Sequence, residues 1–244
     1  MIDSSICVVV PVYNAEKTLE MLADRLTGTL TEFKSYSIVF VDDLSNDNSF
    51  GVIKSLRENN ECITAVRLKR NCGQQAAILC GLKFSDADYT VIMDDDLEND
   101  PSDILKLYEQ AVQGFDVVYG VNAAPGKGAL RSFGSKVREA AITRLSGKPK
   151  EKKVCSFRIM TREIVSRVIE ADTKFVYISL EILKRTKNIG NVNVDYSQSH
   201  RSGYNVFKLT KLLMKMYVYY GRLLKVFRKK GSCYETAEVL EGSK

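Results

Sequence analysis

Short apolar runs alternate with helical patterns through residues 1–120. Runs rich in β-branched residues occupy positions 6–12, 37–41, 63–68, 89–93 and 115–119. Runs of this length and composition are typical of strands that are buried on both faces. Between them, apolar residues recur at helical spacing over positions 15–30, 48–56 and 74–84 and from Pro101 onward. Strands that alternate with helices predict an α/β fold with a mostly parallel sheet and helices on both faces.

The pattern changes after Gly120. Residues 122–128 predict a loop, and the helices and strands expected after it occupy 130–146, 155–160, 162–187 and 192–196. From about 205 to 228, apolar residues recur at helical spacing with Lys and Arg between them, which predicts a basic amphipathic helix. We expect a single domain over residues 1–230, followed by a flexible tail at 231–244.

The charge is divided unevenly along the chain. The net charge of +6 combines residues 1–120, with 10 basic and 20 acidic side chains, and residues 121–244, with 26 basic and 10 acidic ones. The first half therefore carries −10 and the second +16. Clustered carboxylates can hold a metal ion, and a basic face can meet phosphate, nucleic acid or an anionic membrane. The alternative is that the excess charge is ordinary solvated surface.

Other features narrow the cellular setting. No apolar run reaches the roughly 18 residues of a membrane span, and the N-terminal residues carry no basic segment of a secretory signal. The six cysteines form no Cys-x-x-Cys pair and His200 is the single histidine, so we expect neither a zinc site nor a disulfide framework. We expect a protein of the reducing cytoplasm.

Acidic residues gather where two predicted strands end. Asp42 and Asp43 follow one strand, and Asp94, Asp95 and Asp96 follow another, with Glu98 close behind. Adjacent carboxylates repel one another, so such a cluster is unfavourable unless a cation or hydrogen-bond donors compensate. Because alternate residues of an extended segment point the same way, Asp94 and Asp96 can share one side, with Glu98 next in the alternation. Hard oxygen ligands at the carboxyl edge of a sheet suit Mg²⁺ or Mn²⁺ bound to a diphosphate.

Two other interpretations of the acids are weaker. Asn99 or Asp100, ahead of Pro101, would cap the next helix, but capping accounts for a single acid. A phosphoacceptor receiver domain also places acids at strand ends. It begins with the strand that precedes the acidic pair, whereas here a whole strand and helix come before Asp42.

Several motifs together resemble the family-2 glycosyltransferases of the GT-A fold. They are Val10-Pro11-Val12-Tyr13-Asn14, Val41-Asp42-Asp43-Leu44-Ser45-Asn46-Asp47 and Met93-Asp94-Asp95-Asp96-Leu97. Three further stretches resemble the branch related to dolichyl-phosphate mannose synthase and bacterial polyprenyl-phosphate glycosyltransferases. These are Arg70-Asn71-Cys72-Gly73, Ser156-Phe157-Arg158-Ile159-Met160-Thr161-Arg162 and Ser202-Gly203-Tyr204. The resemblance extends from about residue 6 to 225 and implies a GT-A, Rossmann-like sheet.

The resemblance also implies roles for individual residues. Residues 1–120 would bind a nucleotide-sugar and residues 121–230 the acceptor. Asp94 and Asp96 match the Asp-x-Asp motif that holds the metal, and Glu98 falls where the branch usually has Gln. Asp96, Arg158 and Glu181 would serve catalysis. The residues expected to contact substrate are Pro11, Tyr13, Asn14, Asp42, Asp43, Arg70, Gly73, Asp95, Arg131 and Arg201.

The chain departs from the branch on the acceptor side. Lys152, Lys153, Val154 and Cys155 replace a region that usually holds an Asp, and Ser156 replaces a Gly. A sugar hydroxyl as acceptor would need a carboxylate base, for which Glu181 or Asp195 is available, whereas a lipid phosphate is already an anion and needs none. The sequence leaves both acceptors open.

We therefore expect a metal-dependent glycosyltransferase that moves a sugar from a nucleotide-diphosphate sugar to a polyprenyl phosphate or a glycan, with inversion, in cell-envelope or polysaccharide synthesis. A sugar nucleotidylyltransferase would need a Gly-rich loop after the first strand, and a nucleic-acid-binding protein would show aromatic-interleaved motifs; both are missing here. The helix expected at 205–228 would either lie on an anionic membrane or pack on the domain. We expect peripheral contact with the inner face of the membrane.

Overall fold

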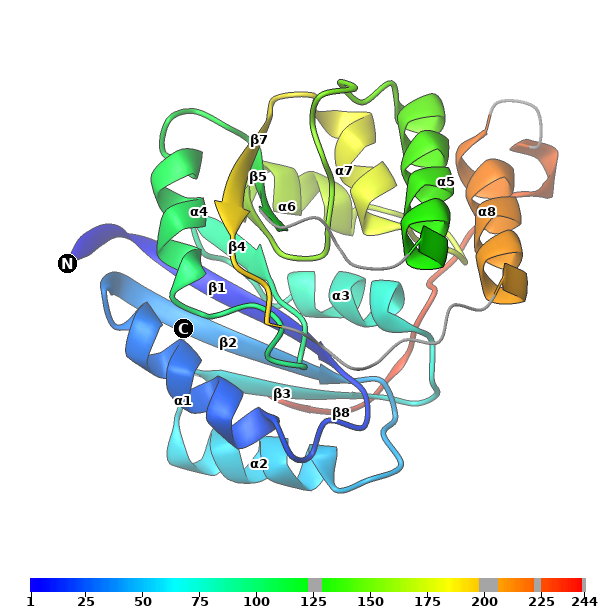
Figure 1. Ribbon diagram of the computed structural model, residues 1–244. Helices are drawn as coiled ribbons and strands as arrows, with labels where there is room; N and C mark the ends of the chain where they lie inside the picture. The colour runs from blue at the N-terminus through cyan, green and yellow to red at the C-terminus, as the bar shows by residue number, and fades with distance from the viewer. Residues whose placement is uncertain (123–128, 198–205, 222–224, 243–244) are drawn as a thin grey trace.

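The chain folds around a single sheet, in which β1 (Ile2–Val12) has a central position. The computed structural model describes residues 1–122, 129–197, 206–221 and 225–242 (Figure 1). Within these residues eight strands pair in the order β7-β5-β6-β4-β1-β2-β3-β8. The other strands are β2 (Phe33–Asp42), β3 (Ile63–Leu68), β4 (Tyr89–Ile92), β5 (Val117–Asn122), β6 (Arg158–Thr161), β7 (Ile189–Val194) and β8 (Thr236–Leu240).

Helices cover both faces of this sheet (Figure 1). They are α1 (Leu19–Leu30), α2 (Ser49–Asn59), α3 (Gln74–Leu82), α4 (Asp103–Ala111), α5 (Ala129–Ser146), α6 (Arg162–Ile169), α7 (Ile178–Arg185) and α8 (Val206–Tyr220), followed by a short 3-10 helix, η1 (Lys225–Phe227). None of the described helices combines the length and the apolar content that a membrane span requires.

The alternation of side chains along β1 divides the interior into two cores. Ile6, Val8 and Val10 point to the face covered by α1, α2 and α4, whereas Cys7 and Val9 point to the face covered by α3, α6 and α7. All five of these side chains are buried, which explains why the strand reads as a continuous apolar run. α5 packs against both α7 and α8 on the second face.

The direction of the strands is mostly parallel, as the alternating pattern predicts. β1 pairs in parallel with β2 on one side and β4 on the other. The order of the strands therefore extends from β1 toward both edges of the sheet. Ligands of open α/β sheets bind at such a switch point, beyond the carboxyl ends of the strands. β6 and β8 run antiparallel to their neighbours. The register of β6 places Arg158 opposite Ile92, next to the point where the acidic loop begins.

The helix predicted at 130–146 is confirmed as α5, but two other helical stretches of the second half are interrupted or shorter than the sequence pattern predicts. Residues 162–187 form two helices, α6 and α7, separated by residues 170–177. The amphipathic helix expected to reach 228 ends at Tyr220. Gly221 follows it, and its N–H donates to the carbonyl of Tyr217, 2.9 Å away. A Cβ at position 221 would approach that carbonyl oxygen to 2.3 Å, so the chain turns where only glycine fits.

The prediction of a flexible tail at 231–244 is wrong for most of the segment. Residues 236–240 form β8, which pairs antiparallel with β3. Without β8, β3 would be an edge strand with a row of unpaired backbone groups. Tyr234, just before β8, is 8% exposed and packs into the core on the α3 face. A strand of five residues that pairs with a distant edge has too weak a local pattern to be found in the sequence.

Replacing Tyr234 by Ala tests this docking. Removal of a buried aromatic ring is expected to lower the free energy of unfolding by about 3 kcal/mol. Urea denaturation followed by circular dichroism measures the change. Tyr217→Ala on α8 is the matched control, because Tyr217 is 37% exposed. Equal stability of the Tyr234 variant and the wild type would mean that the segment does not dock.

Candidate active site

Three loops meet at the carboxyl edge of the sheet, after β1, β2 and β4. Each contains a non-glycine residue with a positive φ, namely Asn14 at 54°, Leu44 at 57° and Leu97 at 59°, and these are all such residues in the described chain. This backbone region is unfavourable for residues other than glycine and is found where surrounding contacts enforce it, often at functional sites. The three loops are therefore shaped by one another.

The loop after β1 is tied to the acidic loop after β4. The N–H of Tyr13 donates to Oδ2 of Asp95 at 3.0 Å, and the Thr18 hydroxyl donates to the Asp95 carbonyl at 2.7 Å. Burial raises the pKa of Asp95 to about 6, although the bond from Tyr13 lowers it. Asp95, expected to contact substrate, thus holds two loops together across the switch point.

The loop after β2 is anchored beneath the surface by Asp42. The Asp42 side chain is fully buried; its Oδ1 accepts the N–H of Ser45 at 3.0 Å, and its Oδ2 lies 3.2 Å from Nε of Arg67. Ser45 in turn accepts the N–H of Asn14, and Asn14 accepts the N–H of Asn46. Asp42 and Asn14 therefore fix the shape of the edge.

Asp43 organises the next loop along the chain. Its two carboxylate oxygens accept the N–H groups of Cys72 and Gly73, each at 2.7 Å. Burial raises the pKa of Asp43, and these two bonds oppose the rise. Gly73 has a φ of 87° and directly precedes α3, so Asp43 fixes a turn that aims the N-terminus of α3 at the cleft.

A cleft of about 300 Å³ lies between these loops. It is lined by Pro11, Val12, Tyr13, Asp43, Asn71, Gly73, Gln74 and Asp95. The structure thus brings together five residues that the sequence predicts as substrate contacts. Arg70 is exposed and does not line the cleft. Asn71 and Gln74 also line the cleft but were not predicted as substrate contacts, although polar residues beside a glycine at a helix start are a usable signal.

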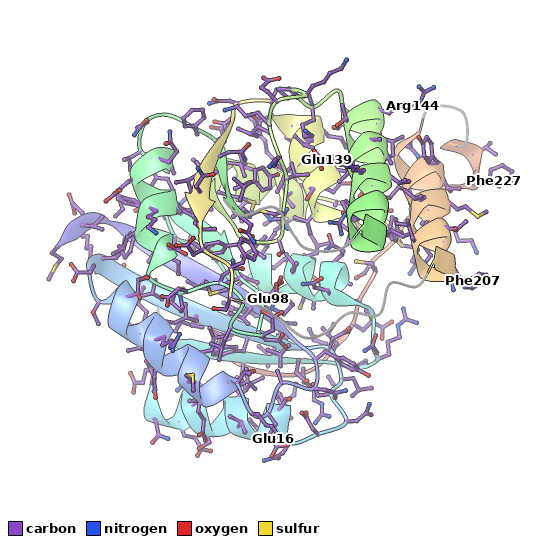
Figure 2. All side chains as sticks on the ribbon, in the orientation of Figure 1. Glu16, Glu98, Glu139, Arg144, Phe207 and Phe227 are labelled. Atoms are coloured by element: carbon purple, nitrogen blue, oxygen red, sulfur yellow. The ribbon has the colours of Figure 1, made fainter. Side chains whose placement is uncertain are left out.

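The acidic loop borders this cleft (Figure 2 labels Glu98 on it). Oδ1 of Asp94 accepts a hydrogen bond from Nε2 of Gln74 at 2.6 Å, and Oδ1 of Asp96 accepts the N–H of Glu98 at 3.0 Å. Burial raises the pKa of Asp94, the charges of Asp96 and Glu98 raise it further, and a hydrogen bond from Ser156 lowers it. Negative charge is therefore held here at a cost that a cation would relieve.

The donor set fits a hard divalent cation. Asp94 and Asp96 supply carboxylate oxygens, the ligands that Mg²⁺ and Mn²⁺ prefer. Within the described ranges, no three Asp, Glu, His or Cys side chains are grouped as a ready-made metal site. Glu98 is thus not assembled with the two aspartates as a third ligand. Two protein carboxylates that share an ion with substrate phosphates are the usual arrangement for Mg²⁺.

Arg158 begins β6, opposite the residue that ends β4 ahead of the acidic loop. Its side chain is 1% exposed, its guanidinium lies 5.7 Å from the centre of the Tyr119 ring, and its NH1 donates to the Ser179 hydroxyl at 2.9 Å. Its charge lowers the pKa of Asp94, against the larger effect of burial. The structure therefore places this predicted catalytic residue beside the acidic loop.

Glu181 has a different environment from the one expected of a general base. Its carboxylate lies 3.0 Å from Nζ of Lys184 and 2.6 Å from NH1 of Arg185. Burial acts to raise the pKa of Glu181, but the charges and hydrogen bonds of these neighbours hold it below its usual value.

Asp195, the other carboxylate considered as a base, is exposed. The side chain of Arg131, and Arg201 with His200, lie outside the described residues.

Comparisons with known proteins identify the family. Residues 7–173 match the model of Glycosyl transferase family 2. The chain is 34% identical over 222 residues to the undecaprenyl-phosphate 4-deoxy-4-formamido-L-arabinose transferase of Pectobacterium atrosepticum, covering 89% of this chain and 67% of that protein. It is 31% identical over 215 residues to the protein of the same name from Pseudomonas aeruginosa, covering 86% and 63%. The chain thus spans about two thirds of the length of these relatives.

Solved structures share the fold at lower identity. Glucosyl-3-phosphoglycerate synthase from Mycobacterium tuberculosis, in complex with Mn²⁺, uridine-diphosphate-glucose and phosphoglyceric acid, superimposes with a TM-score of 0.67 and 15% identity over 94% of this chain and 90% of that one. This likeness confirms the GT-A fold expected from the motifs. The match of family and fold, on a chain whose acidic strand ends form one cleft, shows that this protein belongs to glycosyl transferase family 2 and is a glycosyltransferase.

Proposed function

We propose that the protein transfers a sugar from a nucleotide-diphosphate sugar to a polyprenyl phosphate, using Mg²⁺ or Mn²⁺ held by Asp94 and Asp96. The carrying observation is the single cleft formed by the loops after β1, β2 and β4, with the two aspartates at its border. The names of the relatives support the acceptor class. The complexes of the structural neighbours with uridine diphosphate and Mn²⁺ or Mg²⁺ support the donor and the metal.

Different residues of the cleft would bind different parts of the donor. Pro11, Tyr13 and Asp43 line the part that would hold the nucleoside, and the turn at Gly73 presents the N-terminus of α3 to the diphosphate. The metal supplies electrostatic stabilisation of the negative charge that develops on the leaving diphosphate. Arg158 adds a buried positive charge that acts on Asp94 and so on the proposed metal site.

The surroundings of the Glu181 carboxylate support a phosphate, rather than a sugar hydroxyl, as the acceptor. A general base must be able to take up a proton, but Lys184 and Arg185 stabilise the charged form of Glu181 and lower its pKa. A lipid phosphate attacks as an anion and needs no base. Of the two acceptors that the sequence leaves open, the lipid phosphate is therefore the favoured one.

The acceptor assay is direct. The protein is incubated with Mn²⁺, a panel of radiolabelled UDP-, GDP- and dTDP-sugars, and either undecaprenyl phosphate or undecaprenol. We expect a labelled lipid product with one donor and with the phosphate only. A product formed on undecaprenol, and none on the phosphate, would contradict the proposed acceptor.

The outer surface of α8 and η1 supports a peripheral contact with the inner face of the membrane. We use the name outer surface for Phe207, Met214, Tyr217, Val226 and Phe227, which are 78%, 65%, 37%, 87% and 65% exposed. Figure 2 shows Phe207 and Phe227 at the margin of the molecule, on the side of α8 away from the sheet. Lys211 and Lys215 are exposed on the same helix. Apolar side chains flanked by lysines suit an anionic bilayer surface.

Sedimentation with vesicles tests this contact. The wild type is expected to bind vesicles of anionic phospholipid at low salt and to leave them at high salt, because exposed charges are screened. The paired change Lys211→Gln with Lys215→Gln should weaken binding roughly tenfold or more, since each basic residue near the surface contributes about 1 kcal/mol. Lys34→Gln with Lys54→Gln, remote from α8, makes the same change in charge and is the control. Wild-type protein that ignores the vesicles at low salt would contradict the contact.

A further inference from the structure

Gln74 is the first residue of α3, and the backbone on both sides of it is held in place. Before it, the N–H of Gly73 donates to Oδ2 of Asp43 at 2.7 Å. After it, Oε1 of Gln75 accepts the N–H of Ile178, in the first turn of α7, at 2.9 Å. The start of Gln74's side chain therefore has a defined position at the border of the cleft.

The Gln74 side chain extends from this turn to the acidic loop. Its Nε2 donates to Oδ1 of Asp94, 2.6 Å away. A charged acceptor makes such a bond roughly twice as strong as a bond between neutral groups. Gln74 thus joins the loop after β4 to the same turn that Asp43 ties to the loop after β2.

Burial does not require this hydrogen bond. Gln74 is exposed at the cleft, where water can satisfy its amide. A long exposed side chain contributes little to the core, so replacing Gln74 is expected to leave the fold intact. The main consequence of the bond is the orientation of the Asp94 carboxylate.

An amide donor orients a carboxylate without removing its charge. Glu181 shows the contrast, because Lys184 and Arg185 pair with its carboxylate at 3.0 and 2.6 Å. None of the ion pairs between described residues includes Asp94. Asp94 therefore combines a fixed direction with a negative charge, and a ligand of a divalent cation needs both.

We propose that Gln74 is a positioning residue, which directs the Asp94 carboxylate toward the metal ion and so links the metal site to the turn at Gly73. This inference rests on the proposed function, since it concerns the same metal site. Removal of a residue that orients a metal ligand typically lowers metal affinity or activity by about 10–100-fold. Without the Gln74 amide, Asp94 is free to rotate, whereas the turn at Gly73 keeps its shape because Asp43 still holds it.

The test compares Gln74→Met with Gln113→Met. Methionine is unbranched and a good helix former, but it has no hydrogen-bond donor. Gln113 is exposed just beyond α4 and likewise makes one side-chain bond among those described, from Nε2 of Gln110 at 3.0 Å. Binding of Mn²⁺ is measured from the electron paramagnetic resonance signal of free Mn²⁺. Binding of UDP, GDP and dTDP is measured by calorimetry, both with Mn²⁺ and with a chelator.

We expect Gln74→Met to bind Mn²⁺ about tenfold more weakly and to need about tenfold more Mn²⁺ for half-maximal transfer. In chelator it should bind the nucleoside diphosphate as the wild type does, and Gln113→Met should match the wild type throughout. Wild-type affinity for Mn²⁺ in the Gln74 variant overturns the inference. An equal loss of nucleotide affinity with and without metal also overturns it, because Gln74 would then act on the nucleotide directly. Wild-type protein that neither binds Mn²⁺ nor transfers sugar would instead contradict the proposed function.

Discussion

Replacing Asp96 by Asn is expected to abolish most of the transfer activity, by about a hundredfold or more, while the fold is preserved. Asp96 is exposed, and its Oδ1 accepts the N–H of Glu98, a bond that the amide oxygen of Asn can keep. The substitution removes one of the two negative charges proposed to hold the metal. A metal ion at a leaving diphosphate stabilises the transition state by several kcal/mol.

Steady-state transfer at saturating Mn²⁺ measures this effect. Asp100→Asn is the matched control, since Asp100 is exposed on the same loop and pairs with Arg25 at 3.7 Å, away from the cleft. The control should keep nearly full activity. Full activity of the Asp96 variant, in particular in the presence of a chelator, would contradict the proposed metal site.

Replacing Asp43 by Ala is expected to weaken binding of the nucleotide about tenfold or more. The change leaves the N–H groups of Cys72 and Gly73 without their charged acceptor, and hydrogen bonds to charged groups contribute about 1.5–3 kcal/mol each. The turn at Gly73 and the start of α3 then lose their fixed position against the cleft. Isothermal titration calorimetry with the best nucleoside diphosphate gives the change in affinity.

Asp88→Ala separates this local effect from general destabilisation. The Asp88 carboxylate also holds another segment, because its Oδ2 accepts the N–H of Ser5 at 2.9 Å and the Ser5 hydroxyl at 2.8 Å. It does so at the amino edge of the sheet, where β4 begins. Both variants should lose stability, but only Asp43→Ala should lose nucleotide affinity. Normal affinity in the Asp43 variant would place the donor pocket elsewhere.

The strands and most helices of the first half could be predicted because each carries its own signal. A strand buried on both faces, such as β1, is apolar throughout, and α1 shows its buried face as Leu19, Leu22, Leu26 and Leu30 at helical spacing. β8 could not be predicted, because what stabilises it is the open edge of β3, far away in the sequence.

The candidate site shows the same division. The acidic residues of the site could be located in the sequence because strand ends rich in Asp are unusual. The role of each one could not, because it depends on contacts with residues far away in the chain. Asp43 bonds to a turn about thirty residues away, and Asp95 bonds to Tyr13 across the switch point. Glu181 was expected to act in catalysis, yet Lys184 and Arg185, its neighbours on the next turn of α7, neutralise it. That pairing was visible as helical spacing in the sequence, whereas the bond between Ser179 and Arg158 was not.

Metal-dependent binding of a nucleotide-sugar is tested most directly by a thermal-shift measurement with a panel of UDP-, GDP- and dTDP-sugars, each with Mn²⁺ or with a chelator. A ligand at about a hundred times its Kd stabilises the folded protein by about 2.7 kcal/mol. For a chain of this length, that corresponds to a rise in Tm of about 5–10 °C. We expect such a rise with one nucleotide-sugar in the presence of Mn²⁺, and little or none once the metal is chelated. No rise with any nucleotide-sugar, or an equal rise with and without metal, would contradict it.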